Sequence, residues 1–401
     1  MAGIELSHAE NAGYFGEEGQ DMRCFGKQEI AYLTEVIDSQ ELWRGAKGNF
    51  VYRFEQAFGK HLGRQYVLGV ASGTCANETA LAGLGLQPGD EVICPSTAPI
   101  FVSLPVVSIG CVPVFAEVDP RTLIISPEGI EERITEKTRA VVVVHLFGQP
   151  APMDEILAVT RKHNLNVVED CAQAFDCHYK GRKAGTLGDA TCFSLQQSKH
   201  ITSGEGGIVA TDDAETYKRM VLFATAGMAW YQYDLDKPTA EPLAGLRTRG
   251  HYAFGHNYRM SELQGAVALA QLEKIDALSA QRQALVDIIE GELRDVAGVD
   301  LAFRYPDTRP NYWAYPLRVP ERYSAYAEIN YLEVVYQEME RTRQTSLGIP
   351  LPDYVHYCPG ACPRSEVAAQ RFRPMMVHPA AEPEAVGQAA RELRDAIEKG
   401  A

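Results

Sequence analysis

The sequence has no basic segment followed by an apolar stretch at its N-terminus, so we predict no signal peptide. Its nine cysteines are odd in number and lack the arrangement of a disulfide framework, which favours a reducing, cytoplasmic setting. Positive charge is in the minority: Lys plus Arg total 38, Asp plus Glu total 53, and the formal net charge is −15. This balance argues against a general affinity for nucleic acid or anionic membranes.

An uncharged stretch over residues 93–116 is long enough to cross a membrane, but its prolines favour buried strands and a buried helix.

Motifs of several common cofactor classes are also missing. The sequence contains no P-loop pattern, and no G-x-G-x-x-G follows a predicted strand. The GLGLQPG run at residues 83–89 comes after a helical pattern and has the wrong spacing. His356, Cys358 and Cys362 lie close together, but no second pair follows at the spacing of a zinc site. We therefore expect no metal ion and do not favour a dinucleotide site.

From about residue 66 to residue 211, the chain alternates short β-rich runs with helical patterns. This alternation predicts an α/β domain with a largely parallel sheet. The apolar run RAVVVVHL at residues 139–146 indicates a strand that is buried on both faces. The strands predicted at residues 190–195 and 207–211 are joined by a Gly-rich loop without a helix, so this pair need not be parallel.

A loop, a helix and a second domain are predicted after this alternation. Residues 227–257 are aromatic-rich and non-periodic, and a loop of this length in a compact enzyme indicates a packed, functional segment. A helical pattern at residues 261–293 follows. After it we predict a strand at residues 313–319, a helix at residues 327–342 and a final helix at residues 383–398. We place the boundary near residue 280. Residues 1–280 then hold an N-terminal segment and the large domain, and residues 281–401 form a small α+β domain.

Two polar sites at predicted strand ends are suited to chemistry. Ser72-Gly73-Thr74 opens a helix after a strand, and free N–H groups at the positive end of a helix dipole suit a phosphate. Glu169-Asp170 ends an apolar strand, where open α/β sheets place their ligands. A buried Asp170 needs a cationic partner, which a protonated pyridine nitrogen would supply. The ordinary alternatives are a plain turn at the first site and a helix cap at the second.

The third site is a single lysine, Lys199, between polar residues and the Gly-rich run at residues 204–207. Near a phosphate site and away from solvent, its amine would have a lowered pKa and become a usable nucleophile. The alternative is an exposed loop lysine. Taken together, the three sites offer a phosphate anchor, a pyridinium partner and a Schiff-base amine, which is the set that pyridoxal 5'-phosphate (PLP) requires.

In this order and spacing, the motifs resemble the DegT/StrS-type sugar aminotransferases, which are PLP enzymes of fold type I. The resemblance begins at about residue 27 and weakens after about residue 280. It implies a mostly parallel sheet of the seven-strand type in a large PLP-binding domain, and a homodimer with both active sites at the subunit interface. The matching segments are Ser72-Gly73-Thr74, residues 95–110 with the following VPVF run, EDCAQA at residues 169–174, FSLQQSK at residues 193–199, GEGG at residues 204–207 and NYRMSE at residues 257–262.

The resemblance also implies how the cofactor phosphate is held. By position, Gly73 and Thr74 should bind it through their N–H groups, and Ser194 should add a hydroxyl. Asn257 should reach the phosphate in the partner subunit, which suits its place after the long aromatic loop.

Around the cofactor ring, the resemblance implies that Asp170 pairs with the pyridinium nitrogen and that Lys199 forms the internal aldimine. Gln173 should lie against the ring or reach its phenolic oxygen. The sequence departs from the family at the residue that usually stacks on the ring, because the aligned position is Pro99 rather than an aromatic residue. Phe101 is the candidate substitute.

The implied reaction moves an amino group from an amino acid, with glutamate or glutamine expected, to a ketosugar or ketocyclitol in amino sugar, aminocyclitol or antibiotic biosynthesis. The Gln196-Gln197-Ser198-Lys199 run resembles the aminocyclitol branch, whereas much of the family aminates nucleotide-linked ketosugars. Two alternatives stay open: a PLP enzyme of this fold that is a dehydratase or carbon–carbon bond former, and a non-catalytic regulator. Relatives that dehydrate have His in place of the lysine.

A basic cluster lies around the long loop and consists of Arg247, Arg249, His251 and Arg259. It could bind a donor carboxylate, a substrate phosphate or the dimer partner.

Overall fold

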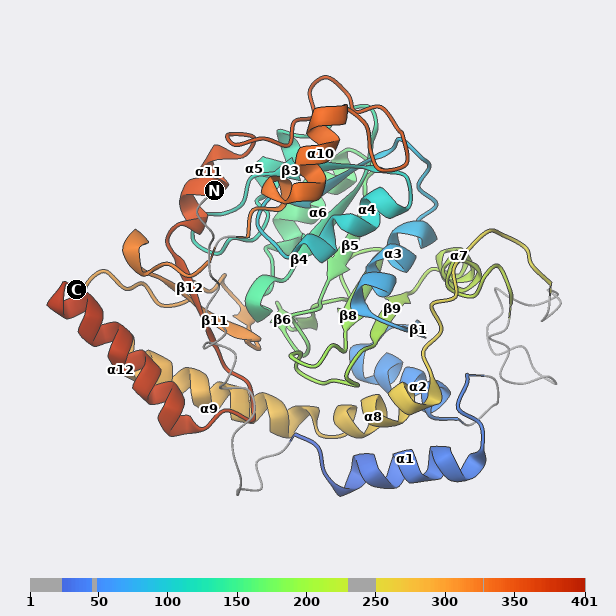
Figure 1. Ribbon diagram of the computed structural model, residues 1–401, viewed down its shortest axis with the longest axis horizontal. Coiled ribbons are helices and arrows are strands. Elements are labelled where there is room, and N and C mark those ends of the chain that lie inside the picture. The colour runs from blue at the N-terminus through green and yellow to red at the C-terminus, as the bar shows by residue number, and fades with distance from the viewer. Residues whose placement is uncertain (1–23, 45–48, 230–249, 327, 401) are drawn as a thin grey trace.

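The computed structural model describes residues 24–44, 49–229, 250–326 and 328–400 (Figure 1). Its centre is a seven-stranded sheet in the order β1-β9-β8-β5-β4-β2-β3. β9 is antiparallel to both neighbours and all other neighbouring pairs are parallel, so the predicted α/β fold with a mostly parallel seven-stranded sheet is confirmed. The strands are β1 (Tyr66–Val70), β2 (Glu91–Pro95), β3 (Val112–Ala116), β4 (Thr138–Val144), β5 (Asn166–Asp170), β8 (Ala190–Ser194) and β9 (Gly207–Thr211).

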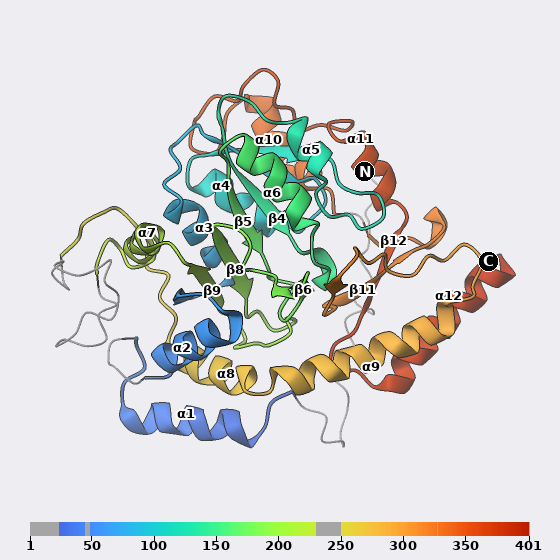
Figure 2. The same ribbon diagram turned by 180° about the vertical axis from the view of Figure 1, so that it is seen from behind.

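Helices cover both faces of this sheet, as the two opposite views show (Figures 1 and 2). The apolar positions of α2 recur at helical spacing, and Phe50, Phe54 and Phe58 are all buried in one cluster with α1 and α8. α3 to α7 contribute to the cluster on the other face. The helices are α1 (Lys27–Ser39), α2 (Phe50–Leu62), α3 (Gly73–Gly83), α4 (Leu104–Ser108), α5 (Pro127–Glu131), α6 (Met153–Lys162), α7 (Ala214–Ala224) and α8 (Glu262–Leu272).

The C-terminal part contributes to two cores. α9 (Ile275–Leu293) and α12 (Pro383–Lys399) form a separate apolar cluster with the antiparallel pair β11 (Ala314–Arg318) and β12 (Phe372–Met376). α10 (Val334–Thr342) and α11 (Pro363–Ala369) instead pack onto the cluster of the large sheet. The boundary predicted near residue 280 falls inside α9, and the division into residues 1–280 and 281–401 stays a prediction. A small sheet of β6 (His178–Tyr179), β7 (Arg182–Lys183) and β10 (Thr308–Arg309) was not predicted.

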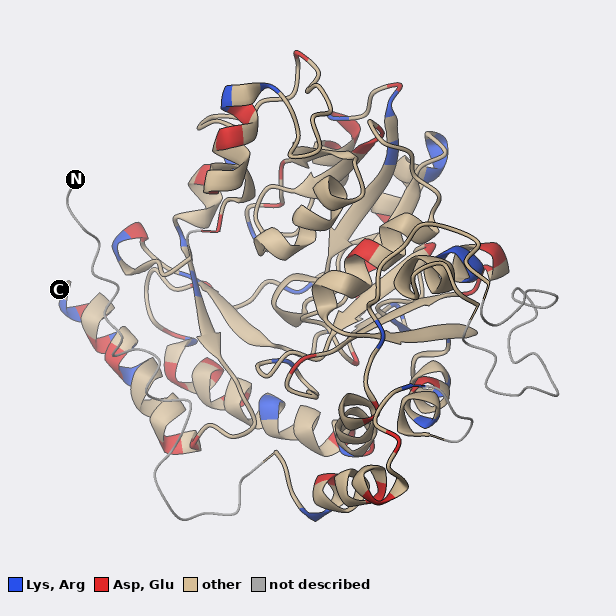
Figure 3. Cartoon of the chain, turned by 45° about the vertical axis from the view of Figure 1, so that its right-hand side comes forward, with Lys and Arg blue, Asp and Glu red and all other residues tan. Residues whose placement is uncertain are grey.

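The central strands carry few charged residues, whereas Lys, Arg, Asp and Glu lie mainly on the outer helices and loops (Figure 3). This distribution matches the apolar strand runs read from the sequence. In the described ranges, none of the helices is long and apolar enough to span a bilayer. The stretch at residues 93–116 forms β2, α4 and β3 and is largely buried, as predicted.

Candidate active site

The carboxyl ends of β1, β8 and β5 meet at one edge of the sheet, because these strands run in the same direction. Asp170 is the last residue of β5, and Ser194 is the last residue of β8. α3 begins at Gly73, shortly after β1, and Lys199 follows β8. Sheet polarity therefore brings these four predicted residues, which are far apart in the sequence, to the edge where open α/β sheets bind ligands.

The start of α3 forms a cradle suited to a phosphate. Ser72 caps the helix, because its Oγ accepts the N–H of Cys75 at 3.2 Å. The N–H groups of Gly73 and Thr74 have no acceptor in the described part of the chain, which leaves two donors at the positive end of the helix. A Cβ on Gly73 would lie 2.6 Å from Ser194 Cβ, so only glycine lets the helix approach β8 this closely.

Asp170 is buried, with 6% of its surface exposed, and has two hydrogen-bond donors. Its Oδ1 accepts the N–H of Ala172 at 2.9 Å, and its Oδ2 accepts from Asn77 Nδ2 at 3.3 Å. Burial raises the pKa of Asp170, and the Ala172 N–H and the charge of Lys199 oppose that rise without cancelling it. Since no described cation forms an ion pair with this carboxylate, a cationic ring nitrogen would suit the site.

Lys199 lies in a turn between β8 and β9, under the C-terminal part of the chain. Its Nζ is 4.7 Å from the centroid of the Trp313 ring. The Trp313 indole N–H donates to the carbonyl of Ser198 at 2.8 Å, and Arg282 Nη2 donates to the carbonyl of Lys199 at 3.1 Å. Burial lowers the pKa of Lys199, and the nearby charges of Asp170 and Glu328 only partly offset that effect. A lowered pKa increases the uncharged fraction of the amine, and the uncharged form is the nucleophile.

Gln173 is buried beside the same edge, and its Oε1 accepts the N–H of Phe147 at 2.7 Å. Its Nε2 has no partner in the part of the chain that the structure describes and remains able to donate to a ligand. Phe147 adopts a left-handed backbone conformation with φ of +58°. Its carbonyl accepts the N–H of Trp313 at 2.9 Å, and its ring lies 5.4 Å from that of Tyr326. Phe147 therefore connects the Gln173 side of the site to the residues that cover Lys199.

The three remaining predicted residues are fully or partly exposed. Asn257 is exposed and forms a β-bridge with Thr225. Phe101 is 60% exposed in the 3-10 turn η2 (Ile100–Val102), and Pro99 is half-buried just before it. The stacking role of Phe101 or Pro99 and the phosphate contact of Asn257 stay predictions. Of the predicted basic cluster, Arg247 and Arg249 lie outside the described residues, as does most of the aromatic loop at residues 227–257.

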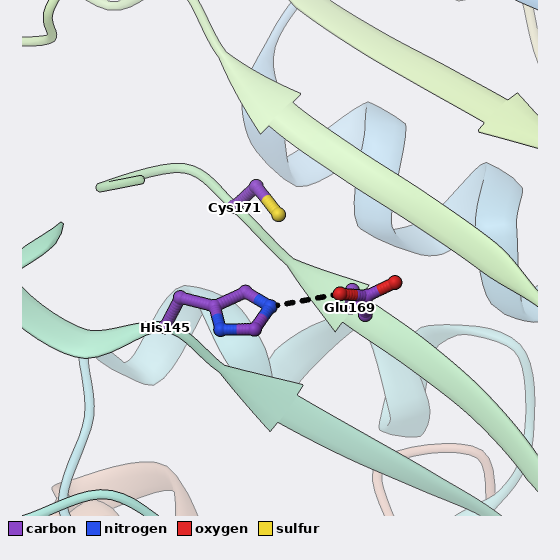
Figure 4. Close-up of side chains that lie close together, drawn as sticks. All are labelled: His145, Glu169 and Cys171. Atoms are coloured by element: carbon purple, nitrogen blue, oxygen red, sulfur yellow. Dashed lines mark hydrogen bonds and ion pairs between the residues drawn. The ribbon is translucent and has the colours of Figure 1, made fainter. Parts of the chain in front are cut away.

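His145, Glu169 and Cys171 place their polar atoms within 4.8 Å of one another, and Figure 4 shows the imidazole directed at the carboxylate. His145 Nε2 donates to Glu169 at 3.0 Å, because its Nδ1 already accepts the N–H of Ala151 at 2.9 Å. Burial raises the pKa of Glu169, but the hydrogen bonds from His145 and from backbone N–H groups outweigh burial and lower it. Both oxygens of Glu169 and both ring nitrogens are thus engaged in supporting β5 rather than available to an ion. The backbone donors, at 2.6–2.8 Å, belong to residues 185, 187 and 188.

Reasoning from the sequence missed Asn77, Trp313 and Phe147. Asn77 follows Gly73 by one helical turn, so helix periodicity could have placed it on the same face. The other two approach the site only through the tertiary fold and carry no local signal.

The residues present fit PLP: two unpaired helix N–H groups, a buried carboxylate and a half-buried lysine lie at one edge of the sheet. The sequence model of the DegT/DnrJ/EryC1/StrS aminotransferase family matches residues 23–394. GDP-perosamine synthase of Escherichia coli O157:H7 is 36% identical over 286 residues, 71% of this chain and 73% of that protein. L-glutamine:2-deoxy-scyllo-inosose aminotransferase of Streptomyces fradiae is 39% identical over 269 residues, 67% of this chain and 62% of that protein. The crystal structure of S. venezuelae DesV in complex with a ketimine intermediate superposes with a TM-score of 0.77 at 28% identity, covering 92% of this chain and 94% of that one.

Proposed function

Because the chain belongs to the DegT/DnrJ/EryC1/StrS aminotransferase family, we propose that this site moves an amino group from an amino acid to the keto group of a sugar or cyclitol. The protein is a PLP-dependent aminotransferase. The observation that supports placing the chemistry here is the desolvated amine of Lys199, which shares one sheet edge with Asp170 and with the start of α3.

PLP, when bound, supplies an electron-accepting ring and an aldehyde that carries the amino group. The N–H groups of Gly73 and Thr74 and the hydroxyl of Ser194 would bind its phosphate. Asp170 would hold the proton on the ring nitrogen, because a buried carboxylate favours a cationic partner. Lys199 would anchor the cofactor and, once displaced by the donor, its amine would move the proton between substrate carbon and cofactor.

The acceptor side of the site is lined from the C-terminal part of the chain. The Tyr326 hydroxyl donates to Glu328 Oε2 at 3.3 Å, and the charge of Glu328 is close enough to Lys199 to act on its pKa. A carboxylate and a phenol are suited to the hydroxyl groups of a sugar or cyclitol. The Gln196-Gln197-Ser198 run and the similarity to the Streptomyces fradiae enzyme favour a ketocyclitol acceptor with glutamine as the donor.

The proposed active unit is a homodimer in the cytoplasm. Asn257 is exposed in the single subunit, as a residue that completes the phosphate site of the partner subunit would be. Lys199 favours amino transfer over dehydration, because an amine is needed to anchor the cofactor and return it after each turnover.

The test is the visible spectrum of the purified protein before and after borohydride. We expect an absorption band that borohydride fixes, with peptide mapping placing the reduced cofactor on Lys199. Lys199→Ala should lack the band, whereas Lys180→Ala, which changes an exposed lysine, should keep it. If added PLP gives no lysine-linked band, the catalytic assignment is wrong and a regulatory role takes its place.

With the band established, a screen should pair glutamine, glutamate and alanine as donors with ketocyclitols and nucleotide-linked ketosugars as acceptors. Turnover of nucleotide-linked ketosugars alone would contradict the cyclitol proposal and leave the transaminase assignment intact.

A further inference from the structure

Two successive turns of α3 face the active-site edge of the sheet. Gly73 and Asn77 are four residues apart, so they lie on the same face of the helix. The first turn meets β8 at Ser194, and the second faces the end of β5. Asn77 is only 1% exposed, and its buried neighbours Ala76 and Ala80 are apolar. A buried amide costs stability unless it is hydrogen-bonded, so its presence here calls for a specific partner.

That partner is Asp170. The one hydrogen bond of the Asn77 side chain within the described residues runs from Nδ2 to Asp170 Oδ2 at 3.3 Å. Asn77 Oδ1 has none there, although it is buried. The contact with the carboxylate is therefore the one polar interaction among the described residues that accounts for an amide at this buried position.

The two oxygens of Asp170 are held from different sides. The N–H of Ala172, from the turn after β5, donates to Oδ1, and Asn77 donates to Oδ2. Donors to a carboxylate stabilise its ionised form and lower its pKa. Burial raises the pKa of Asp170, and the Ala172 N–H is among the groups that oppose that rise. The Asn77 amide donates to the other oxygen, so by its geometry it favours the same ionised form, which Asp170 needs to hold a cationic ring nitrogen.

We propose that Asn77 is a positioning residue that orients the Asp170 carboxylate and keeps it ionised for pairing with the cofactor ring. α3 then serves both ends of the cofactor, with its first turn on the phosphate and its second on the carboxylate beneath the ring nitrogen. This inference rests on the proposed role of Asp170.

The experiment measures how the affinity of the cofactor-free protein for pyridoxine 5'-phosphate depends on pH. This probe carries the ring nitrogen and the phosphate but has no aldehyde, so its binding does not depend on a bond to Lys199. In the wild type, acidification should weaken binding as Asp170 gains a proton. Asn77→Leu keeps the branched arrangement of side-chain heavy atoms and removes the donor, so the midpoint should move to higher pH by about 1–2 units, the size of one hydrogen bond to a charged group.

Two more variants make the result decisive. Asn77→Asp places a second carboxylate beside Asp170 and should shift the midpoint further, so it also serves if Asn77→Leu fails to fold. Thr79→Val is the matched control, because Thr79 is buried on the same helix and its Oγ1 has no partner in the described residues. Its midpoint should equal that of the wild type.

With the natural cofactor, Asn77→Leu should lower kcat about tenfold or more and leave both KM values within about twofold, since Asn77 does not contact substrate. An Asn77→Leu midpoint within about 0.3 pH units of the wild type, or an equal shift in Thr79→Val, would overturn the proposal. Failure of the wild type to bind the probe at any pH would overturn the proposed function and this inference with it.

Discussion

Replacing Gly73 by alanine should separate the phosphate cradle from β8 and weaken cofactor binding. The added Cβ would lie 2.6 Å from Ser194 Cβ and 2.8 Å from its Oγ, whereas ordinary contacts begin at 3.4 Å. Ser194 Cβ is fixed to the backbone and cannot rotate away, so the helix start and β8 must separate by 0.4 Å (3.0 minus 2.6) for a tight contact and by 0.8 Å (3.4 minus 2.6) for an ordinary one. A displacement of about 1 Å at a binding site can cost about 100-fold, and we expect PLP affinity to fall about 10- to 100-fold.

The assay is a titration of the cofactor-free protein with PLP, followed by the absorption of the lysine-bound cofactor. Urea unfolding should show a loss of about 1–3 kcal/mol, as for other overpacked sites. Gly291→Ala is the control, because no atom lies within 4 Å of its added Cβ on α9. It should leave affinity unchanged and stabilise the protein by up to about 1 kcal/mol.

A second-site change tests the steric argument directly. In a Ser194→Gly background the two closest atoms are gone and the Cα of residue 194 remains at 3.1 Å, so Gly73→Ala should cost much less affinity there than in the wild type. The comparison is with Ser194→Gly alone, because both variants lack the Ser194 hydroxyl. Wild-type affinity in Gly73→Ala would show that the start of α3 is not the phosphate site. An equal loss of affinity from Gly73→Ala in the wild type and in the Ser194→Gly background would refute the clash as the cause.

Three further measurements test the buried charges and the subunit interface. Burial lowers the pKa of Lys199, so the folded cofactor-free protein binds fewer protons than the unfolded chain at pH values up to about 10.5. Its free energy of unfolding should therefore rise with pH in that window, and Lys199→Met should lose this rise. Glu169→Gln would set an amide against backbone donors and should destabilise the protein by about 2–4 kcal/mol in urea, while an unchanged midpoint would contradict the support role of that carboxylate. If Asn257 completes the partner's site, a dimer of one Lys199→Ala and one Asn257→Ala subunit has one intact site, so an equal mixture should recover about a quarter of wild-type activity. No gain over either parent would place Asn257 in its own subunit's site or in none.

Much of the fold follows from local pattern. The apolar run of β4 and the strand–helix alternation around it predicted a parallel sheet, because strands buried on both faces need helices on both sides. The pair β8 and β9, joined without a helix, is antiparallel, as a connection that short allows. The C-terminal part was harder to predict. The helix expected at residues 327–342 begins at Val334, after a 3-10 turn, η6 (Asn330–Leu332).

That turn is set by tertiary contacts that leave little trace in the sequence. The N–H of Asn330 donates to the carbonyl of Ser96 at 2.9 Å, and its side chain donates to the carbonyl of Pro95 at 3.2 Å. These bonds fix the C-terminal chain against the end of β2, and they override the helical pattern read there. A single sequence gives helix periodicity but not the distant carbonyls that compete with it.

The properties of the active site likewise fall into those that local pattern predicts and those that only tertiary contacts create. Gly73, Asp170 and Lys199 could be found because each follows a strand whose direction the alternation predicts, so sheet polarity alone brings them to one edge. The low pKa of Lys199 is different, because it is a property of the covering residues rather than of the loop that holds the lysine. Trp313 lies over the amine and is tied to Phe147 by a backbone hydrogen bond, and Phe147 is tied in turn to Gln173. The sequence can therefore identify the lysine, but its desolvation arises only when the C-terminal part packs over the sheet edge, so reactivity and folding of that part are coupled.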